Sequence, residues 1–209
     1  MTIARDETGN GHDGTYGSGV IQGVPGLLVG DPNLAAAFVE GSGHHVTVPI
    51  TSDLKFPDDD FSVEFWVKIT GPVVGDNNIV GWASGGDRSW QIVLTTSGTP
   101  PVRFTGFRND VDVVKTSVAA GTNVEFDTIH HVVTTYDATS DEMILYVDGV
   151  AVDSGTSSGT LNDGSLPIRL GGGSDNNEID GVLDEVAIYD KVLTPSQINH
   201  HYQVGIGVK

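Results

Sequence analysis

The sequence predicts an all-β protein, a sandwich of two antiparallel sheets, and three observations lead to that prediction. Glycine supplies 28 of the 209 residues and proline nine, so turn-forming residues interrupt the chain at short intervals. The apolar runs between them are too short for core helices but suit strands. One run, Phe61–Ile69, alternates strictly between apolar and polar residues, as does a strand with one buried face. We expect one domain over residues 1–209, with a tail at 203–209.

About ten segments combine β-branched and aromatic residues between turn signals and are predicted to be strands of the two packed sheets. In Phe61–Ile69, the clearest of them, alternation places Phe61 on the core face and Trp66 on the opposite face. In chain order the predicted strands are Ala35–Val39, His44–Val48, Phe61–Ile69, Asn78–Ser84, Ser89–Thr95, Val102–Phe107, Ile129–Tyr136, Met143–Val147, Leu166–Gly172 and Gly181–Asp190.

Two local signals fix elements in the second half of the chain. Asp148-Gly149 separates two apolar runs, and both residues tolerate the positive φ of a type I′ turn, so a hairpin is predicted there. Thr194 precedes a proline and stands three residues before Gln197, which is the pattern of a capping box. The sequence therefore predicts one short helix over Pro195–Tyr202.

Composition excludes several classes of partner and site. Lys plus Arg number 10 against 28 Asp plus Glu, and the formal charge of −18 repels phosphate backbones, so no nucleic acid partner is expected. The sequence has no cysteine, which rules out disulfides and thiolate metal sites. No apolar run approaches the roughly 18 residues of a membrane span, and no membrane insertion is expected.

Six segments, in this order, resemble the laminin G-like family of concanavalin A-like jelly rolls. They are residues 6–16 (DETGNGHDGTY), 36–49 (AAFVEGSGHHVTVP), 61–68 (FSVEFWVK), 130–137 (HHVVTTYD), 145–149 (LYVDG) and 181–198 (GVLDEVAIYDKVLTPSQI). The resemblance covers nearly the whole chain and implies a jelly roll of two curved antiparallel sheets. In most relatives such a domain recognises carbohydrate or protein.

The resemblance departs from the family pattern at the N-terminus. Family members usually carry a strand just before the segment that here starts at Asp6, and this chain begins almost on that segment. The chain is then either a piece of a longer protein or a domain with an open sheet edge. An open edge would let another chain pair with it and form an oligomer.

The resemblance also implies a structural calcium ion. The positions that match the family's ligands are Asp6, Asn10, the backbone carbonyl of Gly41, and Asp184. Ca²⁺ prefers six to eight oxygen ligands that mix carboxylates with carbonyls. Asp184 lies in an otherwise apolar strand, where a cation would neutralise it. In the alternative interpretation, Asp184 caps a turn and the other residues only shape a glycine-rich loop.

Aromatic and polar residues gather on neighbouring predicted strands and form a candidate glycan surface. Aromatic faces stack on sugar C–H groups, while Arg, Asp and Asn form hydrogen bonds with hydroxyls. The tryptophans alternatively fill the core between the sheets. The candidate ligand-binding residues are Trp82, Asp87, Arg88, Trp90, Arg103, Arg108 and Asn109.

No catalytic site is predicted. Some relatives hydrolyse glucans with three acidic residues on one strand, and Glu125-Phe126-Asp127 begins such a pattern, but Thr128, Ile129 and His130 follow without a third carboxylate. We therefore expect a non-catalytic recognition or adhesion module that binds carbohydrate and carries calcium. The alternative is a structural or decorating protein of a phage virion or surface layer that binds neighbouring proteins. Both place the chain outside cells, on a cell surface or in a virion.

Overall fold

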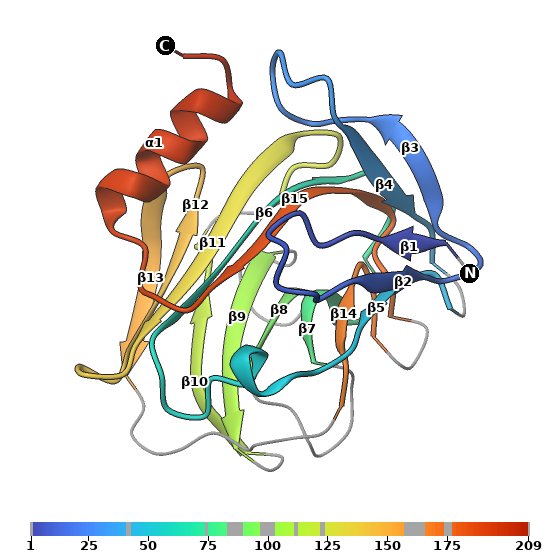
Figure 1. Cartoon of the computed structure of the whole chain (residues 1–209). Coiled ribbons are helices and arrows are strands. Elements are labelled where there is room, and N and C mark those ends of the chain that lie inside the picture. The colour runs from blue at the N-terminus through green and yellow to red at the C-terminus, as the bar shows by residue number, and fades with distance from the viewer. Residues whose placement is uncertain are drawn as a thin grey trace.

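Two antiparallel sheets face each other across one apolar core, which confirms the predicted sandwich (Figure 1). The computed structural model describes residues 2–40, 43–73, 75–82, 90–96, 103–110, 113–121, 124–156, 166–173 and 177–208. Within these residues, no helix is long and apolar enough to cross a bilayer.

The first sheet has eight strands. Their spatial order is β1 (Ile3–Ala4), β2 (Gly14–Tyr16), β5 (Val46–Val48), β14 (Ile168–Leu170), β7 (Asn77–Trp82), β8 (Trp90–Thr95), β9 (Arg103–Asp110) and β10 (Val113–Ala119).

The second sheet has seven strands. Their order is β13 (Val150–Thr156), β12 (Glu142–Val147), β11 (Ile129–Asp137), β6 (Phe61–Ile69), β15 (Gly181–Tyr189), β4 (Leu34–Phe38) and β3 (Ile21–Pro25). A short 3-10 helix, η1 (Ser52–Leu54), precedes β6, and the chain ends with α1 (Pro195–Gly205).

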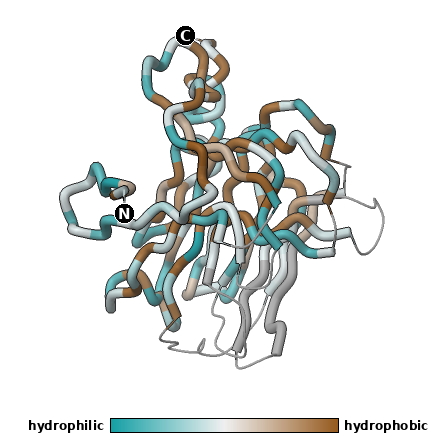
Figure 2. Tube along the Cα trace, turned by 90° about the vertical axis from the view of Figure 1, so that its right-hand side faces the viewer, coloured by the Kyte–Doolittle hydropathy of each residue, from teal (hydrophilic) through white to brown (hydrophobic). Residues whose placement is uncertain are grey.

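The core is filled by large side chains from both sheets. Phe61 of β6 has no exposed surface and lies 5.8 Å, centroid to centroid, from both Trp90 of β8 and Tyr136 of β11. Figure 2 shows the segment after the N-terminus projecting away from the body of the sandwich. Burial of these aromatic groups, together with the aliphatic side chains around them, drives the two sheets together.

The predicted turn and cap are confirmed. Val147 pairs with Val150 across Asp148 (φ 52°) and Gly149 (φ 78°), as a type I′ hairpin requires. The Thr194 side chain accepts a hydrogen bond from the Gln197 N–H, and the Gln197 side chain accepts one from the Thr194 N–H. The helix extends three residues beyond its predicted end at Tyr202, to Gly205.

Two sequence predictions need correction. The described residues contain fifteen strands instead of about ten: β1, β2, β3 and β10 were not among the predicted segments, and β13 is the second arm of the predicted hairpin. The polar face of β6 is not open to solvent: Trp66 is only 3% exposed, because α1 covers it.

The two sides of the sandwich differ. On one side, β10 and β13 meet, and the Ala119 N–H donates to Asp153 Oδ2 at 2.9 Å, which links the two sheets. On the other side the outer strands are β1 and β3. β3 carries a bulge near Gly23 (φ 75°) and ends at Pro25, and both features hinder pairing with another strand.

Candidate functional site

Asp6, the first predicted calcium ligand, organises the loop between β1 and β2. Its Oδ1 accepts hydrogen bonds from the Thr8 hydroxyl (2.6 Å) and the Thr8 N–H (2.9 Å), and its Oδ2 accepts one from the His12 N–H (3.0 Å). The hydrogen bond from the Thr8 side chain, followed by that from the His12 N–H, lowers the pKa of Asp6 far below its usual value. Asn10 lies exposed in the same loop.

Asp184, the second predicted carboxylate ligand, lies in β15 and is 8% exposed. Its Oδ2 accepts a hydrogen bond from the Leu27 N–H at 2.8 Å, and its Oδ1 accepts one from the Glu185 N–H at 3.0 Å. β15 bulges here, with Glu185 at φ 46°. Asp184 therefore ties the loop between β3 and β4 to the second sheet.

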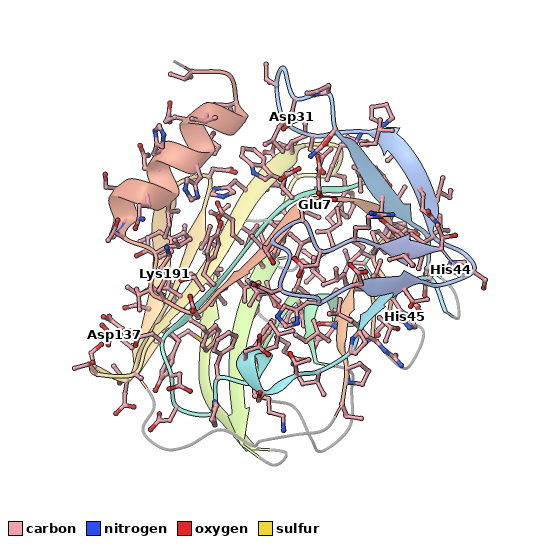
Figure 3. The ribbon with its side chains drawn as sticks, viewed as in Figure 1. Glu7, Asp31, His44, His45, Asp137 and Lys191 are labelled. Carbon is pink, nitrogen blue, oxygen red and sulfur yellow. The ribbon has the colours of Figure 1, made fainter. Side chains whose placement is uncertain are left out.

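Further carboxylates accompany Asp184. Burial raises the pKa of Glu185, and the negative charges of Asp184 and Asp31 raise it further. The Asn33 side-chain amide donates a hydrogen bond to Glu185. Asp31 lies at the tip of the molecule, on the loop after β3 (Figure 3). This group of three carboxylates is electrostatically unfavourable unless a cation or a proton compensates it.

The predicted calcium ligands come from separate parts of the fold. Asp6 and Asn10 belong to a loop of the first sheet, Asp184 belongs to the second, and Gly41 lies outside the described residues. In the part of the chain that the structure describes, no three His, Asp or Glu side chains are arranged to hold a metal ion. The ligand types suit Ca²⁺, and each Asp184 oxygen accepts one hydrogen bond and so retains acceptor capacity.

The candidate glycan residues map to three adjacent strands. In backbone register, Trp82 of β7 pairs with Ile168, and Arg103 and Arg108 of β9 pair with Thr95 and Trp90 of β8. Asn109 pairs with Val114 of β10.

Only one side chain of that set is described. Trp90 has no exposed surface and contacts Phe61, so it fills the core, as the alternative interpretation holds. Asp87 and Arg88, and the side chains of Trp82, Arg103, Arg108 and Asn109, lie outside the described part of the chain.

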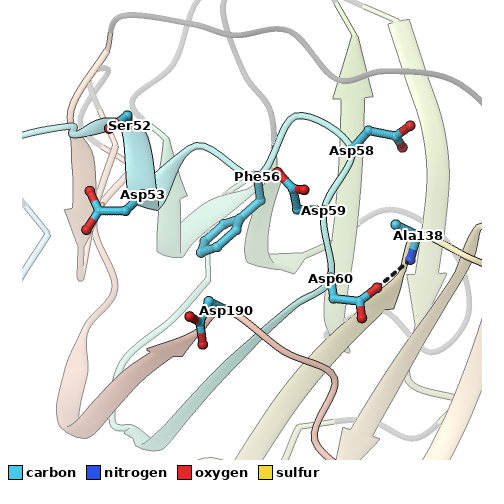
Figure 4. A pocket seen from close by; sticks show the side chains of 8 residues that line it. All are labelled: Ser52, Asp53, Phe56, Asp58, Asp59, Asp60, Ala138 and Asp190. Carbon is cyan, nitrogen blue, oxygen red and sulfur yellow. Dashed lines mark hydrogen bonds between the residues drawn. The ribbon is translucent and has the colours of Figure 1, made fainter.

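An acidic pocket of about 490 Å³ opens where η1, the start of β6 and the end of β15 meet (Figure 4). Figure 4 shows the Phe56 ring pointing toward the space between Asp53 and Asp190. Asp60 accepts a hydrogen bond from the Ala138 N–H at 2.9 Å. The volume is in the range of small-ligand pockets. The lining residues are Ser52, Asp53, Phe56, Asp58, Asp59, Asp60, Ala138 and Asp190.

The sequence did not predict this pocket. The run Asp58–Asp60 is visible as an acidic loop, but Asp190 is 130 positions after Asp60 and reaches the pocket only through the path of β15. Periodicity within a strand contains no signal for such a contact between distant segments.

The partial glucanase pattern lies in a turn. Glu125, Phe126 and Asp127 precede β11 and are exposed, and Asp127 has φ 61°. The Asp127 N–H donates to the Ile69 carbonyl at 2.7 Å, which fixes the turn to the end of β6. These two carboxylates are therefore not on one strand, where the glucanase pattern would place them.

Solved structures similar to this chain include three binding domains. The binding domain of Paraclostridial Mosquitocidal Protein 1 superposes with a TM-score of 0.76 at 16% identity, over 95% of this chain and 48% of that chain. The botulinum neurotoxin serotype G binding domain superposes with a TM-score of 0.70 at 14% identity, over 94% of this chain and 47% of that one. A second structure, the botulinum neurotoxin type G receptor binding domain, gives 0.68 at 14% identity, over 91% and 46%. This chain thus spans about half the length of each.

A search of curated proteins gives no significant match. The family profile described as concanavalin A-like lectin/glucanases superfamily matches residues 40–199, which is most of the chain. The match includes β5 to β15 and the first turn of α1, and therefore the core of both sheets. The chain belongs to this laminin G-like family of the concanavalin A-like lectin/glucanases superfamily.

Proposed function

We propose that this chain is a non-catalytic recognition module that binds carbohydrate. The observation that carries the proposal is its membership of a lectin-type superfamily over residues 40–199. The solved domains of the same fold support it, because they are binding or receptor-binding domains.

Two surfaces offer suitable chemistry for a sugar. The acidic pocket presents carboxylates that accept hydrogen bonds from hydroxyl groups. The surface over β7 to β9 has the predicted positions Arg103 and Asn109, which are six residues apart on β9 and therefore share one face of the sheet. Paired variants separate the two surfaces: Asp59→Asn with Asp190→Asn alters the pocket, and Arg103→Ala with Asn109→Ala alters the strand surface.

The test is binding of a hydroxyl-rich glycan, measured by titration calorimetry, for the wild type and the two double variants. We expect one pair to weaken binding at least tenfold and the other pair to leave it unchanged. Unchanged affinity in both pairs would contradict a site on either surface.

A structural calcium ion is the second part of the proposal. Asp184, together with Asp6, Asn10 and Gly41, is the proposed ligand set. The accumulation of negative charge at Asp31, Asp184 and Glu185 supports a cation near Asp184. At 100 times the dissociation constant, Ca²⁺ would stabilise the fold by about 2.7 kcal/mol, a rise in melting temperature of roughly 5–11 °C.

Thermal unfolding in excess chelator and then in excess Ca²⁺ measures this rise. Asp184→Asn should abolish it, and Asp76→Asn, at an exposed position away from the proposed ligands, serves as the control for the general loss of one negative charge. If wild type melts at the same temperature under both conditions, the chain has no stabilising calcium site.

The alternative function is a structural or decorating role in a phage virion or surface layer. An outer strand available for pairing would favour it, and β1 is the better candidate, because β3 is bulged and β13 contacts β10. Light scattering distinguishes the two functions: a monomer that binds sugars supports recognition, whereas an obligate oligomer without sugar affinity supports the structural role.

A further inference from the structure

A single buried carboxylate, Glu64 of β6, joins the C-terminal helix to the second sheet. Glu64 is 5% exposed and lies on the face of β6 that α1 covers. In Figure 1, α1 lies alongside β11, β12 and β13, on the outside of the sandwich. Glu64, His131, Tyr189 and His201 are here called the Glu64 cluster.

Three donors from three elements converge on the Glu64 carboxylate. Its Oε1 is 2.7 Å from His131 Nε2 of β11 and 2.9 Å from His201 Nδ1 of α1. Its Oε2 accepts the Tyr189 hydroxyl of β15 at 2.8 Å and is 3.1 Å from His201 Nδ1. Each ring nitrogen donates when it carries a hydrogen, so the arrangement suits an ionised carboxylate. A protonated Glu64 would direct its own O–H at these donors.

Apolar packing shields the cluster from water. The Trp66 ring stacks on Tyr202 of α1 at 6.0 Å and lies 4.8 Å from His131. Ile198 of α1 is fully buried in a second apolar cluster with Val133 and Tyr146. Because water is excluded, hydrogen bonds to the charged oxygen atoms are stronger than they would be at a surface.

We propose that the Glu64 cluster is an acid-sensitive latch: ionised Glu64 holds α1 on the second sheet, and its protonation releases the helix and uncovers Trp66. His201 is the residue of α1 that binds Glu64, and its side chain is 36% exposed. The helix can therefore separate from the sheet without opening the core between the sheets. His131, which is fully buried, stays with the sheet.

The direction of the pH dependence follows from the carboxylate. Burial alone would raise the pKa of Glu64, but hydrogen bonds from His131 and Tyr189, with the charges of His131 and His201, outweigh it and leave the pKa below 4.5. A lowered carboxyl pKa means that the latch contributes its full stability above pH 4.5 and loses it as the pH falls through the folded-state pKa.

Other charged groups face the cluster from its neighbours. Lys191 lies 5.9 Å above the Tyr189 ring and is labelled in Figure 3. Burial and the charges of Glu64 and Glu185 raise the pKa of Tyr189, so this hydroxyl stays a donor throughout the acidic range. Burial raises the pKa of Tyr202, and the negative charge of Asp148 raises it further.

Hydrogen exchange of the full chain tests the latch. Exchange at the amides of residues 198–206, corrected for the intrinsic rate at each pH, reports on α1, and the amides of 129–137 in β11 serve as an internal reference. We expect the protection of α1 to fall below pH 4.5 while β11 stays protected. His201→Ala should lower α1 protection about tenfold at pH 7 and flatten its pH dependence, since one charge-assisted hydrogen bond is lost.

His200→Ala is the matched control. His200 is exposed and adjacent to His201, and it is not part of the Glu64 cluster, so its variant should exchange like wild type. Glu64→Gln should remove the pH dependence; if that variant does not fold, His201→Ala carries the test. The latch is refuted if α1 and β11 lose protection together, or if His201→Ala keeps the wild-type pH profile.

Discussion

Trp90 has two possible roles, as a core residue or as part of a sugar-binding surface, and its burial decides between them. It is fully buried and contacts Phe61, although its position among Arg and Asp residues also suits a sugar platform. We expect Trp90→Ala to destabilise the fold by about 3–5 kcal/mol, because a large cavity would open between the sheets. Urea denaturation measures the loss. A change below about 1 kcal/mol would mean that Trp90 does not fill the core.

At Gly205, the close approach of α1 to Trp66 leaves no room for a side chain. A Cβ atom at Gly205 would lie 2.1 Å from the Trp66 ring, so α1 can approach β6 only with glycine at this position. Gly205→Ala should therefore destabilise the fold by about 1–3 kcal/mol, although alanine is the better helix former. Val204→Ala, at a 54% exposed position, should change stability by less than about 0.5 kcal/mol in the same denaturation experiment.

Residue alternation predicted one face of β6 correctly but not the environment of the other. Phe61, Phe65 and Ile69 lie in the core as the period-two pattern requires. The same pattern placed Trp66 on the opposite face but did not indicate that this face, with Glu64, is buried. The covering residues are more than 130 positions away, on α1, and a local pattern contains no information about such packing.

At the scale of elements, the sequence predicted the features that depend only on neighbouring residues. The turn at Asp148-Gly149 and the cap at Thr194 depend on φ preferences and on side-chain hydrogen bonds to nearby N–H groups, and both are present. β1, with two residues, and β3, interrupted by Gly23 and Pro25, are held by strand pairing instead. Their sequences have no period from which a strand could be predicted.

The capping box gives a test of how firmly α1 is anchored at its start. Thr194→Ala removes the side-chain acceptor of the Gln197 N–H and should cost about 1 kcal/mol. Ser196→Ala, one position before Gln197, leaves the box intact and should be near neutral. The loss should appear as weaker exchange protection of α1; equal protection in both variants would show that the cap contributes nothing.

At the scale of the whole molecule, the family and the architecture were accessible from sequence, and the binding surfaces were not. The six matching segments lie on or beside β2 and β5 of the first sheet, β4, β6, β11, β12 and β15 of the second sheet, and α1. Of the predicted glycan residues, Trp82, Trp90, Arg103, Arg108 and Asn109 lie on β7 to β9, and the Trp90 side chain fills the core. The acidic pocket arises only when η1 and the end of β15 meet.

The large negative charge also belongs to this scale. A formal charge of −18 keeps the chain soluble and repels anionic polymers, and it leaves neutral or cation-bridged ligands as the favoured partners. The proposed recognition of carbohydrate, assisted by calcium, is consistent with this negative charge.

The most direct test of the recognition function is binding of the folded chain to a broad panel of immobilised glycans, in Ca²⁺ and in chelator. We predict saturable binding to a subset of glycans, competed by the free sugar. Absence of binding to every glycan, by protein that is folded in the same buffer, would contradict carbohydrate recognition.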